Sequence, residues 1–288
     1  MASETVKKEK KGTNEPVKSD SSANMKSKPD TTPKSPKGAK MQNKILFITG
    51  ADSGIGKACA LLFANEGADV AIVYLNEDDD ANDTKKKIEE YGRKCLLIRG
   101  DLRQEDFCKE AINKTIKEFG RIDVLINNAG TQIEADSLED ISTENMIKTF
   151  ETNIFSMFWI TKAALPHMKK GSAIVNTTSV TAYHGNPKLI DYSATKGAIV
   201  TFTRSLSDNL VSKGIRVNAV APGPIWTPLI TASEPGKTIS QHGAGTPMQR
   251  AGQPSEVAPS YLFLACNEDS SYISGQVLHP NGGEVVNG

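Results

Sequence analysis

Three features are scarce or absent in this sequence, and each absence excludes a class of protein. The longest unbroken apolar run, Ala58–Ala64, is far shorter than the roughly 18 residues that cross a bilayer, so no membrane span is expected. The 34 basic and 34 acidic residues cancel, which gives no overall attraction to nucleic acid. The four cysteines show neither paired nor metal-ligand spacing. We therefore expect a cytoplasmic protein without a metal site and without nucleic-acid or membrane partners.

The first forty residues also lack what a folded segment needs. Residues 1–40 contain no Leu, Ile or aromatic side chain, and they carry ten lysines against five acids. Such a segment cannot bury enough apolar surface to offset the entropy lost on ordering, so we expect a disordered Lys/Ser/Pro-rich tail. The alternative is a basic arm for nucleic acid or membrane, or a targeting address. The five acids and the absence of Arg argue against a mitochondrial presequence.

The rest of the chain alternates short apolar runs with longer segments of helical periodicity. Fully apolar runs are typical of strands buried on both faces of a parallel sheet, and helices between them are typical of crossover connections. The pattern predicts one α/β domain over residues 41–288, a Rossmann-type doubly wound parallel sheet of about seven strands with helices on both faces. The predicted strands are Lys44–Thr49, Val70–Leu75, Cys95–Ile98, Asp123–Asn127, Ala173–Thr177, Ile215–Val220 and Val277–His279, and the predicted helices are Ile55–Asn65, Asn82–Tyr91, Gln104–Phe119, Thr143–His167 and Ser193–Val211.

The first predicted strand ends in a glycine-rich turn. The stretch from Thr49 to Gly56 has the spacing G-x-x-x-G-x-G and leads directly into a predicted helix. Glycines let the backbone turn tightly and approach a pyrophosphate, which the free N–H groups at the start of a helix can bind. A glycine-rich turn after a strand is often only a turn, but its place after the first strand of an α/β pattern favours a dinucleotide site.

A second turn of small residues, Asn127-Asn128-Ala129-Gly130, follows the fourth predicted strand. It is compatible with a plain loop. In a sheet of strand order 3-2-1-4, however, it falls beside the first strand, where a dinucleotide would lie. Its location therefore favours a contact with the cofactor.

Only one of the six tyrosines, Tyr192, is followed four residues later by a lysine, Lys196. On a helix these two side chains share a face, so an ammonium group can lie near the phenol. A nearby positive charge stabilises phenolate and lowers its pKa toward the range that is useful for proton transfer. The same spacing also occurs by chance in many helices.

Two further polar residues precede the pair. Ser179 follows the predicted strand Ala173–Thr177, and its hydroxyl can orient a carbonyl or alcohol oxygen at the tyrosine. Asn153 falls in the middle of a predicted helix, where it can loosen the helix locally and hold a water molecule. Separately, Ser179 is equally compatible with a helix cap and Asn153 with a solvated helix face.

Together these motifs resemble the short-chain dehydrogenase/reductase family, over roughly residues 41–288. The glycine-rich turn, Asn127–Gly130, Asn153, Ser179, Tyr192-x-x-x-Lys196 and Pro222-Gly223 occur in the family's order. The stretches Ala221–Leu229 and Gln276–Gly283 further resemble the glucose and ribitol dehydrogenase homologues and related bacterial oxidoreductases. The resemblance also implies a homo-oligomer, usually a tetramer.

The resemblance implies a role for each matched residue. Tyr192 would be the general acid/base, Lys196 would lower its pKa and bond the nicotinamide ribose, Ser179 would position the reacting oxygen of the substrate, and Asn153 would anchor a water that relays protons. The cofactor would supply the hydride. The residues implied to bind the cofactor, besides Tyr192 and Lys196, are Gly50, Ser53, Gly54, Ile55, Gly56, Asn76, Asp101, Leu102, Asn128, Ala129, Gly130, Pro222, Gly223, Ile225 and Thr227.

The implied function is an NAD(P)-dependent oxidoreductase that interconverts an alcohol and a carbonyl compound. The polar segment Leu229–Arg250 falls where this family has its substrate lid, and its polarity is compatible with a polyol or sugar. Small aldehydes and ketones remain open as substrates. A non-catalytic dinucleotide-binding regulator is the alternative, but a pure binder does not need Asn153, Ser179, Tyr192 and Lys196.

The loop after the second predicted strand bears on cofactor choice. An acid at this place bonds the ribose 2′-hydroxyl and repels a 2′-phosphate. Here Asn76 stands where the resemblance would place an Asp, and the four acids of Glu77–Asp80 follow it. Lys57, just after the glycine-rich turn, is the nearby base that the sequence reveals. We therefore expect NAD to be preferred over NADP.

Overall fold

The computed structural model describes residues 21–22, 25, 27–33, 38–233, 236 and 238–286. The prediction of a disordered tail therefore falls outside the described residues for residues 1–20 and in part for residues 21–40. The predicted lid segment Leu229–Arg250 is described except at 234, 235 and 237. None of the helices within these ranges is long and apolar enough to cross a membrane.

The described strands form one parallel sheet of seven in the order β3-β2-β1-β4-β5-β6-β7. The predicted Rossmann-type sheet and its 3-2-1-4 beginning are confirmed. The order reverses between β1 and β4, so the loops that follow these two strands lie at the switch point where such sheets bind ligands. The strands are β1 (Ile45–Thr49), β2 (Asp69–Tyr74), β3 (Cys95–Arg99), β4 (Val124–Asn127), β5 (Ala173–Thr177), β6 (Arg216–Val220) and β7 (Val277–Leu278).

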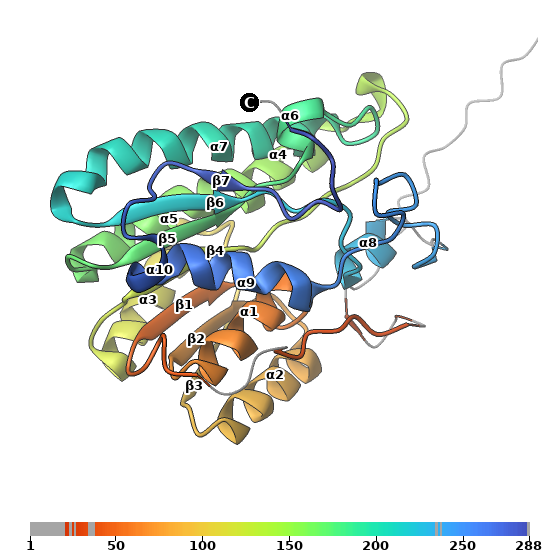
Figure 1. The fold of residues 1–288 in the computed structure, drawn as a ribbon. Helices are drawn as coiled ribbons and strands as arrows, with labels where there is room; N and C mark the ends of the chain where they lie inside the picture. Colours follow the sequence, from red (N-terminus) through yellow and green to blue (C-terminus); the bar gives the residue numbers. More distant parts are fainter. Residues whose placement is uncertain are drawn as a thin grey trace, which may run out of the picture.

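Helices cover both faces of this sheet (Figure 1). The reason is visible in β1, where every side chain is buried but successive side chains enter different cores. Leu46 and Ile48 pack with α1 and α9, whereas Phe47 packs on the other face with α3 and α5. The helices are α1 (Gly54–Asn65), α2 (Asp78–Glu90), α3 (Glu105–Phe119), α4 (Thr143–Phe150), α5 (Ser156–Ala164), α6 (Thr181–His184), α7 (Ile190–Leu210), α8 (Pro228–Ser233), α9 (Pro254–Ala265) and α10 (Asn267–Ser270).

The helix predicted over Thr143–His167 is not continuous. A π-helical turn, Glu151–Phe155, separates α4 from α5, and Asn153 lies at its centre. The helix is thus interrupted at the position of Asn153, where local loosening was expected. Such single π-turns are frequent at functional sites.

Helix α9 was absent from the sequence prediction because Pro254 and Pro259 break the helical pattern. Pro254 occupies the first turn, where the missing N–H costs nothing, and a capping box of Gln253 and Glu256 fixes the start of the helix. Apolar side chains of α9 pack with α1 in the same core as Leu46 and Ile48. This packing outweighs the cost of Pro259 in the helix interior.

The described residues between 21 and 33, here called the N-terminal strap, pack on the body of the protein. Figure 1 shows this red segment running between α2 and α8. The Ser21 and Ser22 hydroxyls and the Ser22 N–H donate to the Asp80 carboxylate at the start of α2. Met25 is only 5% exposed and packs against Trp226 and Ala251. The described part of the tail thus differs from the expectation of an unpacked segment.

Main-chain groups of the N-terminal strap also form hydrogen bonds with the body of the protein. The Trp226 indole N–H donates to the Ser27 carbonyl at 2.9 Å. The Asp30 N–H donates to the Gln253 side chain at 2.9 Å, and the Asp30 carbonyl accepts from the Ser255 N–H at 2.9 Å. Main-chain hydrogen bonds do not require apolar side chains, which explains how a segment of this composition packs.

We expect Met25→Asp to lower the Tm by about 4–8 °C, because a carboxylate would replace a buried apolar side chain at a cost of about 2 kcal/mol, with about 2–4 °C per kcal/mol. Deleting residues 1–33 should have an effect of similar size. Deletion of residues 1–20 alone is the matched control and should leave the Tm unchanged. Thermal unfolding of the three variants checks this, and an unchanged Tm for Met25→Asp would show that the strap adds no stability.

Candidate active site

The four predicted catalytic residues come from three elements that meet at the carboxyl edge of the sheet. Tyr192 and Lys196 lie one turn apart on α7, Ser179 follows β5, and Asn153 lies in the π-helical turn. The Lys196 ammonium is 5.2 Å from the centre of the Tyr192 ring and donates to the Thr177 carbonyl at 3.0 Å. The Ser179 side chain lies close enough to the Tyr192 hydroxyl to lower its pKa. The structure therefore gathers the hydroxyl pair and the lysine in one place.

Burial controls the pKa values of this cluster. It raises the pKa of Tyr192 to about 12, against the opposing effect of the nearby Ser179 side chain. It lowers the pKa of Lys196 to about 8. The expected lowering of the phenol pKa by Lys196 is thus wrong for this structure, because the ammonium group is itself desolvated and is directed at the Thr177 carbonyl. A phenol that holds its proton at neutral pH is suited to act as an acid.

Asn153 connects the π-helical turn to the loop after β4. Its side-chain oxygen accepts from the Thr131 N–H at 2.8 Å, and its amide donates to the Thr131 carbonyl at 2.9 Å and to the Thr195 hydroxyl at 3.1 Å. A Cβ placed on Gly130 would lie 3.5 Å from both the Asn153 oxygen and the Lys196 ammonium. Asn153 thereby fixes the backbone beside the tyrosine–lysine pair.

The glycine-rich turn leaves the start of α1 open. Gly50 and Gly54 have φ values of +65° and +54°, which disfavour any other residue. Gly56 packs against the Gly50 carbonyl with no space for a side chain. The Ser53 side chain makes no capping hydrogen bond. It therefore does not compete for the N–H groups in the first turn of α1, which includes Ile55. An anionic group can reach these N–H groups, as the pyrophosphate of a dinucleotide requires.

The turn Asn127–Gly130 lies directly against the glycine-rich turn, as its sequence position predicted. The Asn128 amide donates to the carbonyls of Thr49 and Gly50, and the Thr49 hydroxyl accepts from the N–H groups of Asn128 and Ala129. A Cβ on Gly50 would lie 2.9 Å from the Ala129 backbone. The two turns form one continuous surface.

The stretch Pro222–Thr227 joins the tyrosine to the glycine-rich turn. At one end the Pro222 carbonyl accepts from the Val180 N–H, next to Ser179, and Gly223 is held by the Pro280 carbonyl. At the other end a Cβ on Gly54 would meet the Thr227 methyl at 3.3 Å. Ile225 and Thr227 are both buried. The stretch therefore connects the loop of Ser179 with the glycine-rich turn.

The end of β3 and the loop after it contain bases that the sequence did not reveal as neighbours of the β2 loop. Arg99 is the register partner of Tyr74 and donates to Asp78 at 3.0 Å. Hydrogen bonds from Arg103 keep the pKa of Asp101 below its usual value although burial acts to raise it, and Leu102 beside it is buried. Asn76 is exposed at the end of β2. Only the pairing of β2 with β3 reveals that Arg99 is here, because it is distant from Asn76 in the sequence.

Comparison with known proteins agrees with this geometry. The model of a family described as enoyl-(acyl carrier protein) reductase matches residues 50–284. The uncharacterized oxidoreductase YhxC of Bacillus subtilis is 60% identical over 88% of this chain and 88% of its own length. The chain belongs to the short-chain dehydrogenase/reductase family.

Other members of this family are similar in sequence or structure. The NADPH-dependent aldehyde reductase 1 of Arabidopsis thaliana is 54% identical over 86% of this chain and 88% of its own. The glucose and ribitol dehydrogenase of Daucus carota is 52% identical over 86% and 87%. A short-chain dehydrogenase of Burkholderia cenocepacia in complex with NADP has a TM-score of 0.79 and 30% identity, over 85% of this chain and 98% of that one.

Membership of the short-chain dehydrogenase/reductase family confirms the predicted fold and class. The protein is an oxidoreductase of this family that uses a nicotinamide cofactor and acts on CH–OH groups. Three features fit such a cofactor. The first N–H groups of α1 are not capped by Ser53, Gly56 has no side chain where the backbone is close to Gly50, and Gly130 is small beside Lys196. The roles of the individual residues remain predictions.

Proposed function

We propose that the protein interconverts a polyol or sugar alcohol and its carbonyl form, with Tyr192 transferring the proton. The observation that carries this proposal is the placement of the Ser179 side chain beside the Tyr192 hydroxyl, with the Lys196 ammonium 5.2 Å from the centre of the tyrosine ring. Ser179 orients the reacting oxygen, and the Tyr192 hydroxyl protonates or deprotonates it. A bound nicotinamide dinucleotide supplies or accepts the hydride.

The same residues suggest how the cofactor is held. Gly50, Gly54 and Gly56 would line the pyrophosphate, with Ser53 and Ile55 in the same turn. Asn128, Ala129 and Gly130 would lie toward the adenosine side and its ribose, with Asp101 and Leu102 at the adenine. Pro222, Gly223, Ile225 and Thr227 would hold the nicotinamide, and Lys196 would bond its ribose.

Aldehyde reduction is a second candidate, because a relative at 54% identity is named an NADPH-dependent aldehyde reductase. An assay over polyols, sugars, aldehydes and ketones with both cofactors separates the two. Turnover of polyols or sugars supports the first proposal, and turnover of simple aldehydes alone supports the second. Absence of turnover with every class would contradict both.

We predict that NAD binds more tightly than NADP. The bases near the end of β2 are already paired, Lys57 with Asp83 at 2.6 Å and Arg99 with Asp78 at 3.0 Å, so the remaining acids of this loop repel a 2′-phosphate. The Asn76 amide can bond a ribose hydroxyl. Titration of both cofactors at matched ionic strength checks this prediction. Tighter binding of NADP would mean that Arg99 or Lys57 exchanges its acid for the phosphate.

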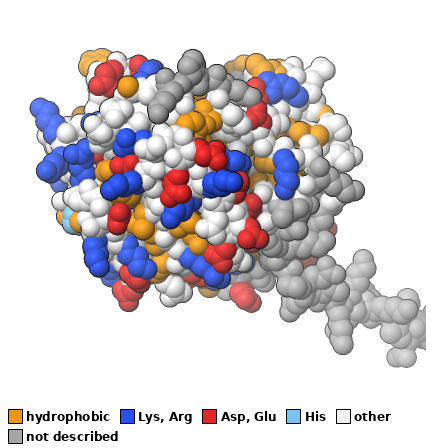
Figure 2. All heavy atoms as spheres, turned by 90° about the horizontal axis from the view of Figure 1, so that it is seen from below, with side chains coloured by type: hydrophobic (Ala, Val, Ile, Leu, Met, Phe, Trp, Pro, Cys, Tyr) orange, Lys and Arg blue, Asp and Glu red, His pale blue; other side chains and the backbone are white. Residues whose placement is uncertain are grey.

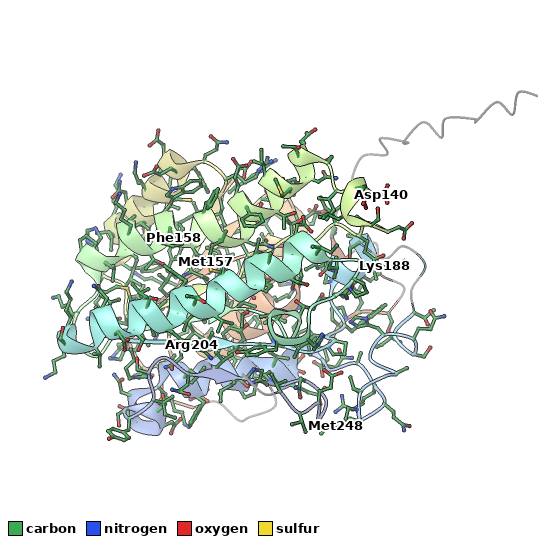
Figure 3. All side chains as sticks on the ribbon, turned by 90° about the horizontal axis from the view of Figure 1, so that it is seen from above. Asp140, Met157, Phe158, Lys188, Arg204 and Met248 are labelled. Atoms are coloured by element: carbon green, nitrogen blue, oxygen red, sulfur yellow. The ribbon has the colours of Figure 1, made fainter. Side chains whose placement is uncertain are left out.

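We propose that the protein forms a homo-oligomer through α4 and α5, and a tetramer would match the family resemblance. Ile147 on α4 and Phe158 on α5 are 47% and 52% exposed, which leaves large apolar side chains available for an interface. Figure 3 looks onto this side of the molecule, with Phe158 on α5 beside α7. By contrast, basic and acidic side chains are interspersed over the face shown in Figure 2. A monomer in light scattering would contradict the proposal.

We also propose a cytoplasmic location, with residues 41–288 as the catalytic domain. All four cysteines are free thiols, which is typical of a reducing compartment. Localisation of the tagged full-length chain tests this.

A further inference from the structure

Gln132 lies next to the catalytic cluster, but the motifs that define the site do not include it. It follows Thr131, whose backbone N–H and carbonyl are both held by Asn153. Three residues later, the Ala135 N–H donates to the Lys188 carbonyl at 3.0 Å, and Lys188 also pairs with Asp136. The loop is thus fixed between the π-helical turn and the start of α7, where Figure 3 labels Lys188.

The Gln132 side chain is directed toward α8. It is 8% exposed, and its amide donates to the Ser233 hydroxyl at 2.8 Å. Helix α8 begins at Pro228, immediately after Thr227, which touches the glycine-rich turn at Gly54. Gln132 therefore connects the loop beside Asn153 with the helix that follows the proposed nicotinamide stretch.

The hydrogen-bonding capacity of this amide is only partly used. Among the described residues, the Gln132 carbonyl oxygen has no hydrogen-bond donor, and only one of the two amide hydrogens has an acceptor. The Ser233 hydroxyl is itself committed, because it donates to the Leu229 carbonyl at 2.9 Å. Although the residue as a whole is buried, its carbonyl oxygen is accessible, so a ligand that reaches it can use the remaining capacity.

We propose that Gln132 is a specificity-determining residue that binds a hydroxyl group of the substrate next to the reacting carbon. A hydroxyl group is both a donor and an acceptor, as an amide is, so it can satisfy the free carbonyl oxygen and the free amide hydrogen. The substrate class is therefore a polyhydroxylated alcohol or carbonyl compound rather than a simple one. This inference rests on the proposed function, since it concerns the same reacting oxygen at Ser179 and Tyr192.

The test compares Gln132→Leu with the wild type on two aldehydes of equal chain length, glyceraldehyde and propanal. For glyceraldehyde we expect kcat/KM to fall about 10–100-fold, mainly through KM, because a lost hydrogen bond weakens binding of ground state and transition state alike. For propanal the change should stay within about threefold. Gln132→Glu keeps the acceptor and should recover part of the loss. Asp136→Asn, an exposed change in the same loop, is the matched control and should leave both substrates unaffected.

Each outcome separates the inference from the proposed function. Equal losses on the two aldehydes, or a wild type that turns over propanal but not glyceraldehyde, would overturn the role of Gln132 while leaving hydride transfer intact. If the enzyme turns over neither aldehyde, ligand binding is measured instead, through its effect on the Tm. In that case ribitol should raise the Tm of the NAD-loaded wild type but not that of NAD-loaded Gln132→Leu, and an equal effect of ribitol on both would overturn the inference.

Discussion

Tyr192→Phe is expected to lower turnover by about 10²–10⁴-fold, the usual contribution of a positioned acid or base. The substitution deletes one hydroxyl, which Ser179 contacts, and keeps the ring that lies over Lys196. Without that hydroxyl the reacting oxygen has no partner for its proton. Steady-state kinetics with the best substrate from the panel measures the loss.

Cofactor binding is the control for Tyr192→Phe. Its dissociation constant should change by less than about threefold, because most of the proposed contacts with the dinucleotide come from other residues. Tyr261→Phe is a matched variant, since its hydroxyl is bonded to Thr177 in the core and is proposed to play no part in the reaction. Retention of more than about a third of the wild-type rate by Tyr192→Phe would rule out the proposed role of Tyr192.

Lys196→Met should reduce turnover at least as strongly and should also weaken cofactor binding. Turnover is expected to fall by about 10³–10⁴-fold, because the ammonium group next to the phenol is lost together with a proposed bond to the nicotinamide ribose. The cofactor dissociation constant should rise about tenfold, the equivalent of one hydrogen bond. A variant that loses turnover with unchanged cofactor affinity would contradict the ribose contact.

The stability of Lys196→Met distinguishes this role from a structural one. The pKa of Lys196 is lowered from 10.5 to about 8 in the folded protein, so the folded state binds fewer protons than the unfolded state between these values. Stability of the wild type should therefore rise with pH from about 8 to about 10.5 by this group's contribution. The Met variant should lack that rise and should not be less stable at neutral pH. A large fall of its Tm at neutral pH would instead indicate that Lys196 holds the fold.

The sheet was predictable because most residues of its strands are apolar and their boundaries are turns. Polar side chains occur within β5 and β6, at Asn176, Arg216 and Asn218. Strand β1 begins one residue later than predicted, and β7 ends one residue earlier. The interruption at Asn153 was anticipated from one polar residue in a helix. Helix α9 was not, because its two prolines conflict with local propensity and only the packing against α1 resolves that conflict.

The candidate site, too, was predictable from the sequence only in part. Motifs predicted which loops meet, since parallel strands bring their carboxyl ends to one edge. They did not reveal Arg99, whose place depends on the register of β2 with β3, or Gln132, which is bonded to a residue 101 positions away. The burial that raises the pKa of Tyr192 is likewise a property of packing and not of spacing along a helix.

The N-terminal strap is held on the protein partly because it belongs to the same chain. Its attachment to Trp226 and α9 uses its own main-chain groups at Ser27 and Asp30. A covalent tether gives such a segment an effective local concentration of the order of millimolar, so weak individual bonds are enough to keep it bound. Substitutions at its exposed positions should therefore be tolerated, while a peptide of the same sequence added in solution should bind the truncated protein only weakly.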